Sequence, residues 1–339
     1  MISGWRIKHL LVAWTIEIET VFLLLKLTIT KNMKNKNMII SRKKVTILLF
    51  LSFSFIIAHS KKKIKHVFLA VDESRSQLHY VNQFEPEKDW TISLPAKYRD
   101  IHLLQNKTIL LSTKNGYALY DFNTHQKLKE VNEQKFFGTQ SVIPTANNTK
   151  IIGCIQTKML QGKKSKGVAI YELDSNDKVS REVFFKGYKT LRLLRLSQDG
   201  SFLFGDDEKV VKAAWDGASQ EFALSDQKMH IYEILESSKD QQHYIVSTGY
   251  GGTLEEWSKE GGFIRKIAGN TAQEKKYYYF ADAQKLSSST WGVCNWTGHH
   301  AQDSHKAPQL FEFDEKGKIV WQWHDPKKAG TIHGVCFIE

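Results

Sequence analysis

Short stretches of alternating apolar and polar residues dominate the chain from about residue 66 onward. Two alternating strands joined by a polar turn recur six times, and the copies begin at Leu78, Ala118, Val168, Val210, Leu254 and Leu310. Residues 310–323 give the clearest copy, because a Glu-Lys-Gly turn separates Leu-Phe-Glu-Phe-Asp from Lys-Ile-Val-Trp-Gln-Trp. Alternation on both sides of a glycine-containing turn predicts a β-hairpin. This part of the sequence lacks helical periodicity with capping residues, so the pattern predicts an all-β protein.

A second pair of strands precedes the hairpins, for example in residues 101–112 and 191–205. Four strands within about 40–50 residues are the repeating unit of a β-propeller blade. Six hairpins therefore predict a six-bladed β-propeller. A seven-bladed ring is the alternative, and it would need a further repeat hidden in the long third or sixth unit.

The two ends of the repeating region predict how the ring closes. Residues 331–339 look like one more inner strand with no blade after it, whereas the region from residue 66 starts with outer strands and no inner one. We therefore expect the C-terminal strand to join the first blade, which removes the exposed sheet edges. Residues 61–339 form a single propeller domain in this interpretation.

The basic charge is concentrated at the N-terminus. The net charge is +12, but residues 1–65 hold 13 Lys and Arg against two acids, and the remainder holds 35 against 34. The predicted propeller is therefore nearly neutral. It lacks the broad basic surface expected of a nucleic-acid-binding protein, so no nucleic-acid partner is predicted.

Residues 1–60 form a leader with the features of a secretory signal peptide in its second half. Within residues 38–60, a short basic segment precedes an apolar run over 45–58, which ends in a small-x-small cleavage pattern at Ala58-His59-Ser60. The run is shorter than the roughly 20 residues that span a bilayer. We expect export to the periplasm or the extracellular space. Met33 and Met38 are alternative start sites, and an uncleaved leader would be the only membrane contact.

The phrase Phe313-Asp-Glu-Lys-Gly317-Lys-Ile-Val-Trp321 is typical of one propeller superfamily. Because of this phrase, the region from residue 66 to 339 resembles the quinoprotein-like and YVTN-type propellers. The resemblance implies the fold, and the superfamily includes quinone-dependent dehydrogenases, aryl sulfotransferases and non-catalytic scaffolds. The dehydrogenases often carry adjacent cysteines, whereas Cys154, Cys294 and Cys336 are isolated in apolar segments. A bound quinone is not expected, and no cofactor is predicted.

Six polar residues lead into the predicted inner strands, which line the channel of a propeller. They are His102, Gln140, Arg192, His230, Tyr279 and His333. If they converge at one mouth, imidazoles with a guanidinium suit an anionic or polyhydroxylated ligand, or proton transfer near neutral pH. A solvated channel lining is the alternative interpretation.

The long sixth unit contains a second group of candidates. His299, His300, Asp303 and His305 lie within seven residues, and imidazole and carboxylate groups both bind divalent metals. Their spacing matches no recognised metal signature. Ligand contact, a divalent metal and an ordinary surface loop therefore all stay open for this segment.

Together these features favour an exported propeller that binds a small polar or anionic ligand, carbohydrate-like ligands included, at the channel mouth. One alternative is an enzyme, a lyase or group transferase, that uses the channel histidines as acids and bases. Another is a scaffold that binds a protein partner. Fold alone does not separate these functions.

Overall fold

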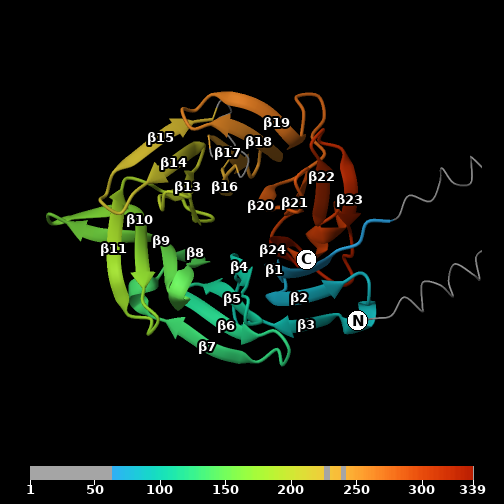
Figure 1. Ribbon diagram of the computed structural model, residues 1–339, viewed down its shortest axis with the longest axis horizontal. Coiled ribbons are helices and arrows are strands. Elements are labelled where there is room, and N and C mark those ends of the chain that lie inside the picture. The colour runs from blue at the N-terminus through green and yellow to red at the C-terminus, as the bar shows by residue number, and fades with distance from the viewer. Residues whose placement is uncertain (1–62, 225–229, 238–241, 339) are drawn as a thin grey trace, which may run out of the picture. The chain divides into compact units, whose positions relative to one another are not determined.

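The computed structural model describes residues 63–224, 230–237 and 242–338. The predicted leader, residues 1–60, therefore lies outside the described residues. In this described part, 24 strands form six four-stranded antiparallel sheets arranged as the blades of a ring (Figure 1). The prediction of a six-bladed β-propeller is confirmed, and the seven-bladed alternative is wrong.

Each blade runs from an inner strand beside the ring axis to an outer strand at the rim. Blade 1 contains β24 (Ile332–Ile338), β1 (Val67–Asp72), β2 (Gln77–Asn82) and β3 (Trp90–Ser93). Blade 2 contains β4 (Ile101–Leu103), β5 (Thr108–Thr113), β6 (Gly116–Asp121) and β7 (Lys127–Asn132). Blade 3 contains β8 (Thr139–Pro144), β9 (Lys150–Leu160), β10 (Lys163–Leu173) and β11 (Val179–Lys186).

The second half of the ring repeats the same plan. Blade 4 contains β12 (Arg195–Leu196), β13 (Phe202–Asp206), β14 (Lys209–Ala213) and β15 (Ser219–Ala223). Blade 5 contains β16 (Glu233–Glu236), β17 (His243–Ser247), β18 (Thr253–Ser258) and β19 (Phe263–Gly269). Blade 6 contains β20 (Phe280–Lys285), β21 (Thr290–Asn295), β22 (Leu310–Asp314) and β23 (Ile319–Trp323).

Helical structure in the described residues is limited to four short 3₁₀ segments. They are η1 (Pro86–Lys88), η2 (Gln134–Phe136), η3 (Ala146–Asn148) and η4 (Ala301–His305). In the part of the chain that the structure describes, no helix has the length and apolar character needed to cross a membrane.

The ring closes through β24, as the sequence predicted. This strand pairs antiparallel with β1, so that Phe68 lies opposite Phe337 and Ala70 opposite Val335. The length of the third unit comes from the 11-residue strands β9 and β10. The length of the sixth comes from the 296–309 connection that carries η4. Neither conceals an extra blade.

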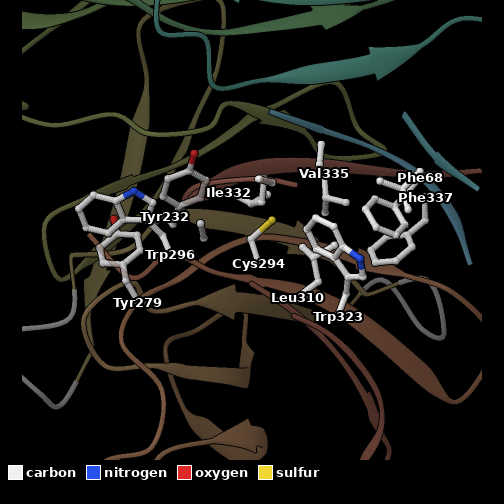
Figure 2. Packing of buried hydrophobic residues seen from close by; sticks show 14 of the residues in the cluster. Phe68, Tyr232, Tyr279, Cys294, Trp296, Leu310, Trp323, Ile332, Val335 and Phe337 are labelled. Carbon is white, nitrogen blue, oxygen red and sulfur yellow. The ribbon is translucent and has the colours of Figure 1, made fainter. Parts of the chain in front are cut away.

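Burial falls from the inside of each blade to its outside. All six residues of β5 are buried, whereas five of the six in β7 are exposed. The central strands are buried on both faces because neighbouring blades cover them, which explains their nearly continuous apolar runs. Between blades 6 and 1, Phe68 packs against Trp323 and Phe337 at ring distances of 5.3 and 5.8 Å (Figure 2).

All six inner strands run in the same direction along the ring axis, because every blade has the same strand order. We call the end of the axis where these strands begin the entry end, and the end where they finish the exit end. Side chains near the start, middle and finish of the inner strands therefore form three successive levels along the axis.

Candidate functional site

A buried group of charges occupies the middle level of the axis. The Arg195 Nε donates to Glu233 Oε1 at 2.6 Å, and Nη1 lies 3.2 Å from both carboxylate oxygens of Asp100. Asp282 Oδ1 lies 3.8 Å from Arg195 Nη2. The three carboxylate side chains are at most 7% exposed. We call Asp100, Arg195, Glu233 and Asp282 the ionic layer.

Hydrogen bonds from the other inner strands hold the ionic layer in place. Ser141 Oγ and the Val142 N–H donate to Asp100 Oδ2, the latter at 3.1 Å. The Val335 N–H of β24 donates to Asp282 Oδ2 at 2.9 Å. The ionic layer therefore connects all six blades at the axis, because each blade supplies either a charge or a donor.

The carboxyl groups of the ionic layer respond differently to burial. Burial alone would raise the pKa of Asp100, but the charges of Arg195 and His102 hold it well below its usual range. Burial, together with the charge of Glu233, raises the pKa of Asp282 well above its usual range, although Arg195 opposes this. Asp282 therefore keeps its proton to a higher pH than an ordinary aspartate, whereas Asp100 is ionised at neutral pH.

A second group of polar side chains gathers at the entry end. Arg99 Nη1 donates to the Gln140 side-chain oxygen. Arg192 reaches His230 Nε2 with Nε at 3.0 Å and Nη2 at 2.6 Å, and His230 Nδ1 lies 3.1 Å from Asp207 Oδ1. Since Arg192 can only donate hydrogen bonds, His230 Nε2 is the acceptor. Its Nδ1 therefore carries the hydrogen and donates it in a hydrogen bond to Asp207 Oδ1.

Buried aromatic rings lie beneath these polar groups. Tyr232 Oη is 2.9 Å from His333 Nδ1, and the Tyr279 ring stacks with the His333 ring at 6.3 Å and 16°. Trp296 packs edge-on against both Tyr279 and His333 at 5.5 Å. Figure 2 shows Tyr232, Tyr279 and Trp296 together at one end of the apolar cluster. We call these three residues and His333 the aromatic floor.

The entry end carries positive charge on guanidinium groups and not on imidazoles. Burial, followed by the charges of Arg99 and Arg192, lowers the pKa of His333 well below its usual range. Burial and then Arg192 also lower the pKa of His230, against the opposing effect of Asp207. Both imidazoles are neutral at pH 7. Among the described residues, neither Arg99 nor Arg192 has a carboxylate within ion-pair distance.

Five of the six predicted channel residues come together at the entry end, and His102 does not. Gln140, Arg192 and His230 lie at the entry end, while Tyr279 and His333 lie in the aromatic floor, 3% and 5% exposed. His102 lies past the ionic layer and lines a cavity at the exit end. The expected convergence was wrong for this residue, because blade 2 places Arg99 at the entry end, two residues before β4 begins.

Three residues of this region were not predicted from the sequence. Arg99 stands just before a short strand, so it looked like part of the preceding loop. Tyr232 is fully buried between Tyr279 and His333, and its pattern indicated only a core position. Tyr250 is 59% exposed and its ring lies 4.7 Å from that of Tyr279, although it comes from a turn outside the inner strands.

The four candidates in the 296–309 connection are not gathered around one point. His299 packs on Trp296 at 4.5 Å, and its Nδ1 lies 3.8 Å from Glu73 Oε2, so it adjoins the entry end. His300 and Asp303 cap η4 instead, and Asp303 also pairs with Lys306. His305 is exposed in the last turn of η4. Within residues 63–224, 230–237 and 242–338, no three His, Cys, Asp or Glu side chains are arranged to hold a metal ion.

Comparisons with known proteins agree on the fold. No protein-family model matches the chain, and no curated protein matches it. Among solved structures, a protein of unknown function from Bacteroides caccae is similar at 18% identity with a TM-score of 0.65, covering 81% of this chain and all of the other. A protein from Lactobacillus plantarum is similar at 13% identity with a TM-score of 0.52, covering 81% of this chain and all of the other.

A third similar structure is a catalytically inactive variant of virginiamycin B lyase from Staphylococcus aureus, solved with quinupristin. It has 12% identity and a TM-score of 0.52, covering 81% of this chain and 90% of the lyase. These similarities extend around the ring and show a shared six-bladed propeller, in agreement with the resemblance to quinoprotein-like and YVTN-type propellers. Their functions are mixed, so the site residues have to be interpreted from their own chemistry.

Proposed function

We propose that the protein binds a small anionic ligand at the entry end of the propeller axis. One observation carries this proposal. Arg99 and Arg192 are both half-buried over the aromatic floor, and neither has a carboxylate partner among the described residues. Buried cations normally have an anionic partner, so two guanidinium groups without one favour an anion supplied by the ligand.

The surrounding groups support a ligand that also carries polar or ring substituents. Guanidinium groups bind carboxylate, sulfate and phosphate through paired hydrogen bonds. The Gln140 amide, which donates to the Gly138 carbonyl at 3.2 Å, lies beside Arg99, and the exposed Tyr250 ring stands at the rim. An aromatic rim with a few fixed polar groups is typical of sites that bind small molecules, sugar acids included.

An enzymatic role for the same site is the second candidate, and His230 favours it. This residue is held by Asp207 on one ring nitrogen and Arg192 on the other, and its backbone has a φ of +52°. Strained backbone and an oriented, neutral imidazole are typical of general acid–base groups. Virginiamycin B lyase, which shares the fold, is inactive as a histidine-to-alanine variant. A lyase acting on an anionic substrate is the reaction that His230 would suit.

We also infer export from the leader, which would bring the entry end into contact with solutes outside the cytoplasm. N-terminal sequencing of the mature protein tests this inference. A new N-terminus near residue 61 would support it, and an intact leader on a cytoplasmic protein would contradict it.

Thermal unfolding in the presence of small ligands tests the binding proposal. The panel contains sulfate, phosphate, citrate and glucuronate, with glucose as the neutral control. A ligand that binds only the folded state adds about 2.7 kcal/mol at one hundred times its Kd. We expect at least one anion to raise the melting temperature, and the variant Arg99→Gln/Arg192→Gln to lose that shift.

Arg265→Gln is the matched control, because it also removes an arginine charge but lies on the outer strand β19, paired with Glu256. It should keep the full shift. The proposal fails if no anion stabilises the protein, or if the double variant and the control respond equally. His230→Gln separates the two functions, since an enzyme would bind its ligand and lose turnover, whereas a binding protein would only bind more weakly.

A further inference from the structure

A cavity of about 350 Å³ opens at the exit end, on the other side of the ionic layer from Arg99 and Arg192. Its walls are largely apolar and include Ile101, Leu235, Trp291 and Val335. Its polar surface includes the ionic-layer residues Arg195, Glu233 and Asp282. The volume lies within the range of small-molecule sites, and apolar walls around a few fixed polar groups are their usual composition.

Asp282 lines this cavity with one carboxyl oxygen to which the described residues donate no hydrogen bond. Its side chain is 7% exposed, and Oδ2 accepts the Val335 N–H. Oδ1 has no hydrogen-bond donor among the described residues, and its nearest cation, Arg195 Nη2, is 3.8 Å away. The other donors of Arg195 serve Glu233, Asp100 and the Leu194 carbonyl. A carboxyl oxygen that faces a cavity and has no donor from the protein can accept a hydrogen bond from a ligand.

The ionic layer places three carboxyl groups beside the single guanidinium of Arg195, and Lys285 also lines the cavity. Burial and the charge of Glu233 raise the pKa of Asp282, so that it keeps its proton to a higher pH than an ordinary aspartate. Glu236, which also lines the cavity, is already paired with Lys259 at 2.5 Å. The titratable and charged groups around Asp282 and its cavity are Asp100, His102, Arg195, Tyr232, Glu233, Glu236, Lys285, Cys294 and Cys336.

We propose that the exit-end cavity is a second binding site, which takes a small organic ammonium with its charged group on Asp282 Oδ1 and its alkyl part along the apolar walls. This site is separate from the anion site at the entry end. An ammonium donates a hydrogen bond to Asp282 Oδ1 and pairs with the Asp282 carboxylate. A metal ion is a poorer occupant, because the described residues offer no group of three metal-binding side chains.

Proton release accompanies this binding. Where Asp282 is protonated in the free protein, it loses its proton to solvent when a cation takes the proton's place, so up to one proton leaves for each ammonium bound. The affinity for an ammonium therefore rises with pH, up to tenfold per unit while Asp282 is protonated. The affinity for a neutral molecule of the same shape does not change.

Cys336 supplies the assay, because it lines the cavity and is half-buried, whereas Cys154 and Cys294 are fully buried. The purified protein is treated with methyl methanethiosulfonate at alkaline pH, since burial raises the pKa of the Cys336 thiol. The probe is n-butylammonium, with 1-butanol and butyrate as neutral and anionic controls. At ten times its Kd the probe occupies about nine tenths of the sites, so the modification rate falls about tenfold.

We expect n-butylammonium to protect Cys336 saturably, more strongly at higher pH, and butanol and butyrate to have little effect. Asp282→Asn should remove the protection, and the hairpin-turn variant Asp314→Asn should keep it. Calorimetry of the unmodified protein in two buffers of different ionisation enthalpy measures proton release, which covers the case that Asp282→Asn does not fold. Equal protection by butanol, or binding without proton release, overturns the proposal. Arg99→Gln/Arg192→Gln should leave the protection unchanged.

Discussion

The ionic layer predicts a large and pH-dependent loss of stability when its single cation is removed. Arg195→Met keeps an unbranched chain of similar length but leaves Asp100, Glu233 and Asp282 without their guanidinium. The side chains of these acids are at most 7% exposed, and two of them are hydrogen-bonded to Arg195, at 2.6 and 3.2 Å. Removing one partner of a buried ion pair costs about 3–5 kcal/mol, because the remaining charge is uncompensated. At about 2–4 °C per kcal/mol, the melting temperature falls by roughly 10 °C.

The stability lost in Arg195→Met should increase with pH. In the native protein Arg195 holds the pKa of Asp100 below its unfolded value, so Asp100 stabilises the fold at neutral pH and loses this effect only as the pH falls through its folded pKa. Without Arg195, the effect of burial, which raises the pKa of Asp100 and Asp282, loses its main opposing charge. Carboxyl groups with a raised pKa favour the folded state only while they are protonated, so the free energy of unfolding falls as the pH rises. The penalty of Arg195→Met is therefore smallest near pH 5 and largest near pH 8.

Urea unfolding followed by tryptophan fluorescence, at pH 5 and at pH 8, measures both effects. Arg265→Met is the control, because Arg265 is 42% exposed and its pair with Glu256 should be worth at most about 1 kcal/mol. Adding Glu233→Gln to Arg195→Met should recover part of the loss, since it removes one uncompensated charge. A penalty below about 1 kcal/mol at pH 8, or one that does not change with pH, would refute the reasoning.

Two further predictions concern single residues of the scaffold. Asp72 accepts hydrogen bonds from the Ser74 hydroxyl and the Gly330 N–H, and His79 Nε2 lies 3.5 Å from its Oδ2. Burial raises the pKa of Asp72, but these neighbours outweigh burial and lower it, so Asp72→Asn should cost about 1–3 kcal/mol at pH 7 and less near pH 3, as denaturant unfolding at the two pH values will show. Gly138 has a φ of +84° and a Cβ there would overlap the Ile155 carbonyl, whereas Gly162, at +76°, has open space around it. Gly138→Ala should therefore lower the unfolding free energy by about 3 kcal/mol and Gly162→Ala by about 1, and equal losses would contradict the clash.

The fold could be predicted from the sequence because its main features are local. Alternation on both sides of polar turns defines each hairpin, and a ring of hairpins needs only their number and the unpaired strand at each end. The partner of β1 followed from the same reasoning, since a lone inner strand at residues 331–339 had one vacant position to fill. Each inference used residues within one blade or at the two ends of the ring.

The site was harder to predict because its groups come from different blades. Arg195 contacts acids from blades 2, 5 and 6, and nothing in the segment around Arg195 indicates these partners. The sequence indicated polar residues near each inner strand but not their level along the axis, and a shift of one residue in a strand reverses the side-chain direction. His102 was misplaced for this reason. The His299–His305 cluster looked dense in sequence, but η4 turns its members to different surroundings.

The pairing of β24 with β1 also sets the order of events when the chain is made. A ribosome releases the first strands of blade 1 long before β24, so the inner edge of β1 stays open until almost the whole ring has emerged. An open edge next to apolar strands is a site of aggregation, and contacts between segments far apart in sequence form slowly. During synthesis the chain therefore stays incompletely folded until late. For the export that we propose, this delay is an advantage, because a translocation pore that passes unfolded chains would meet no closed ring.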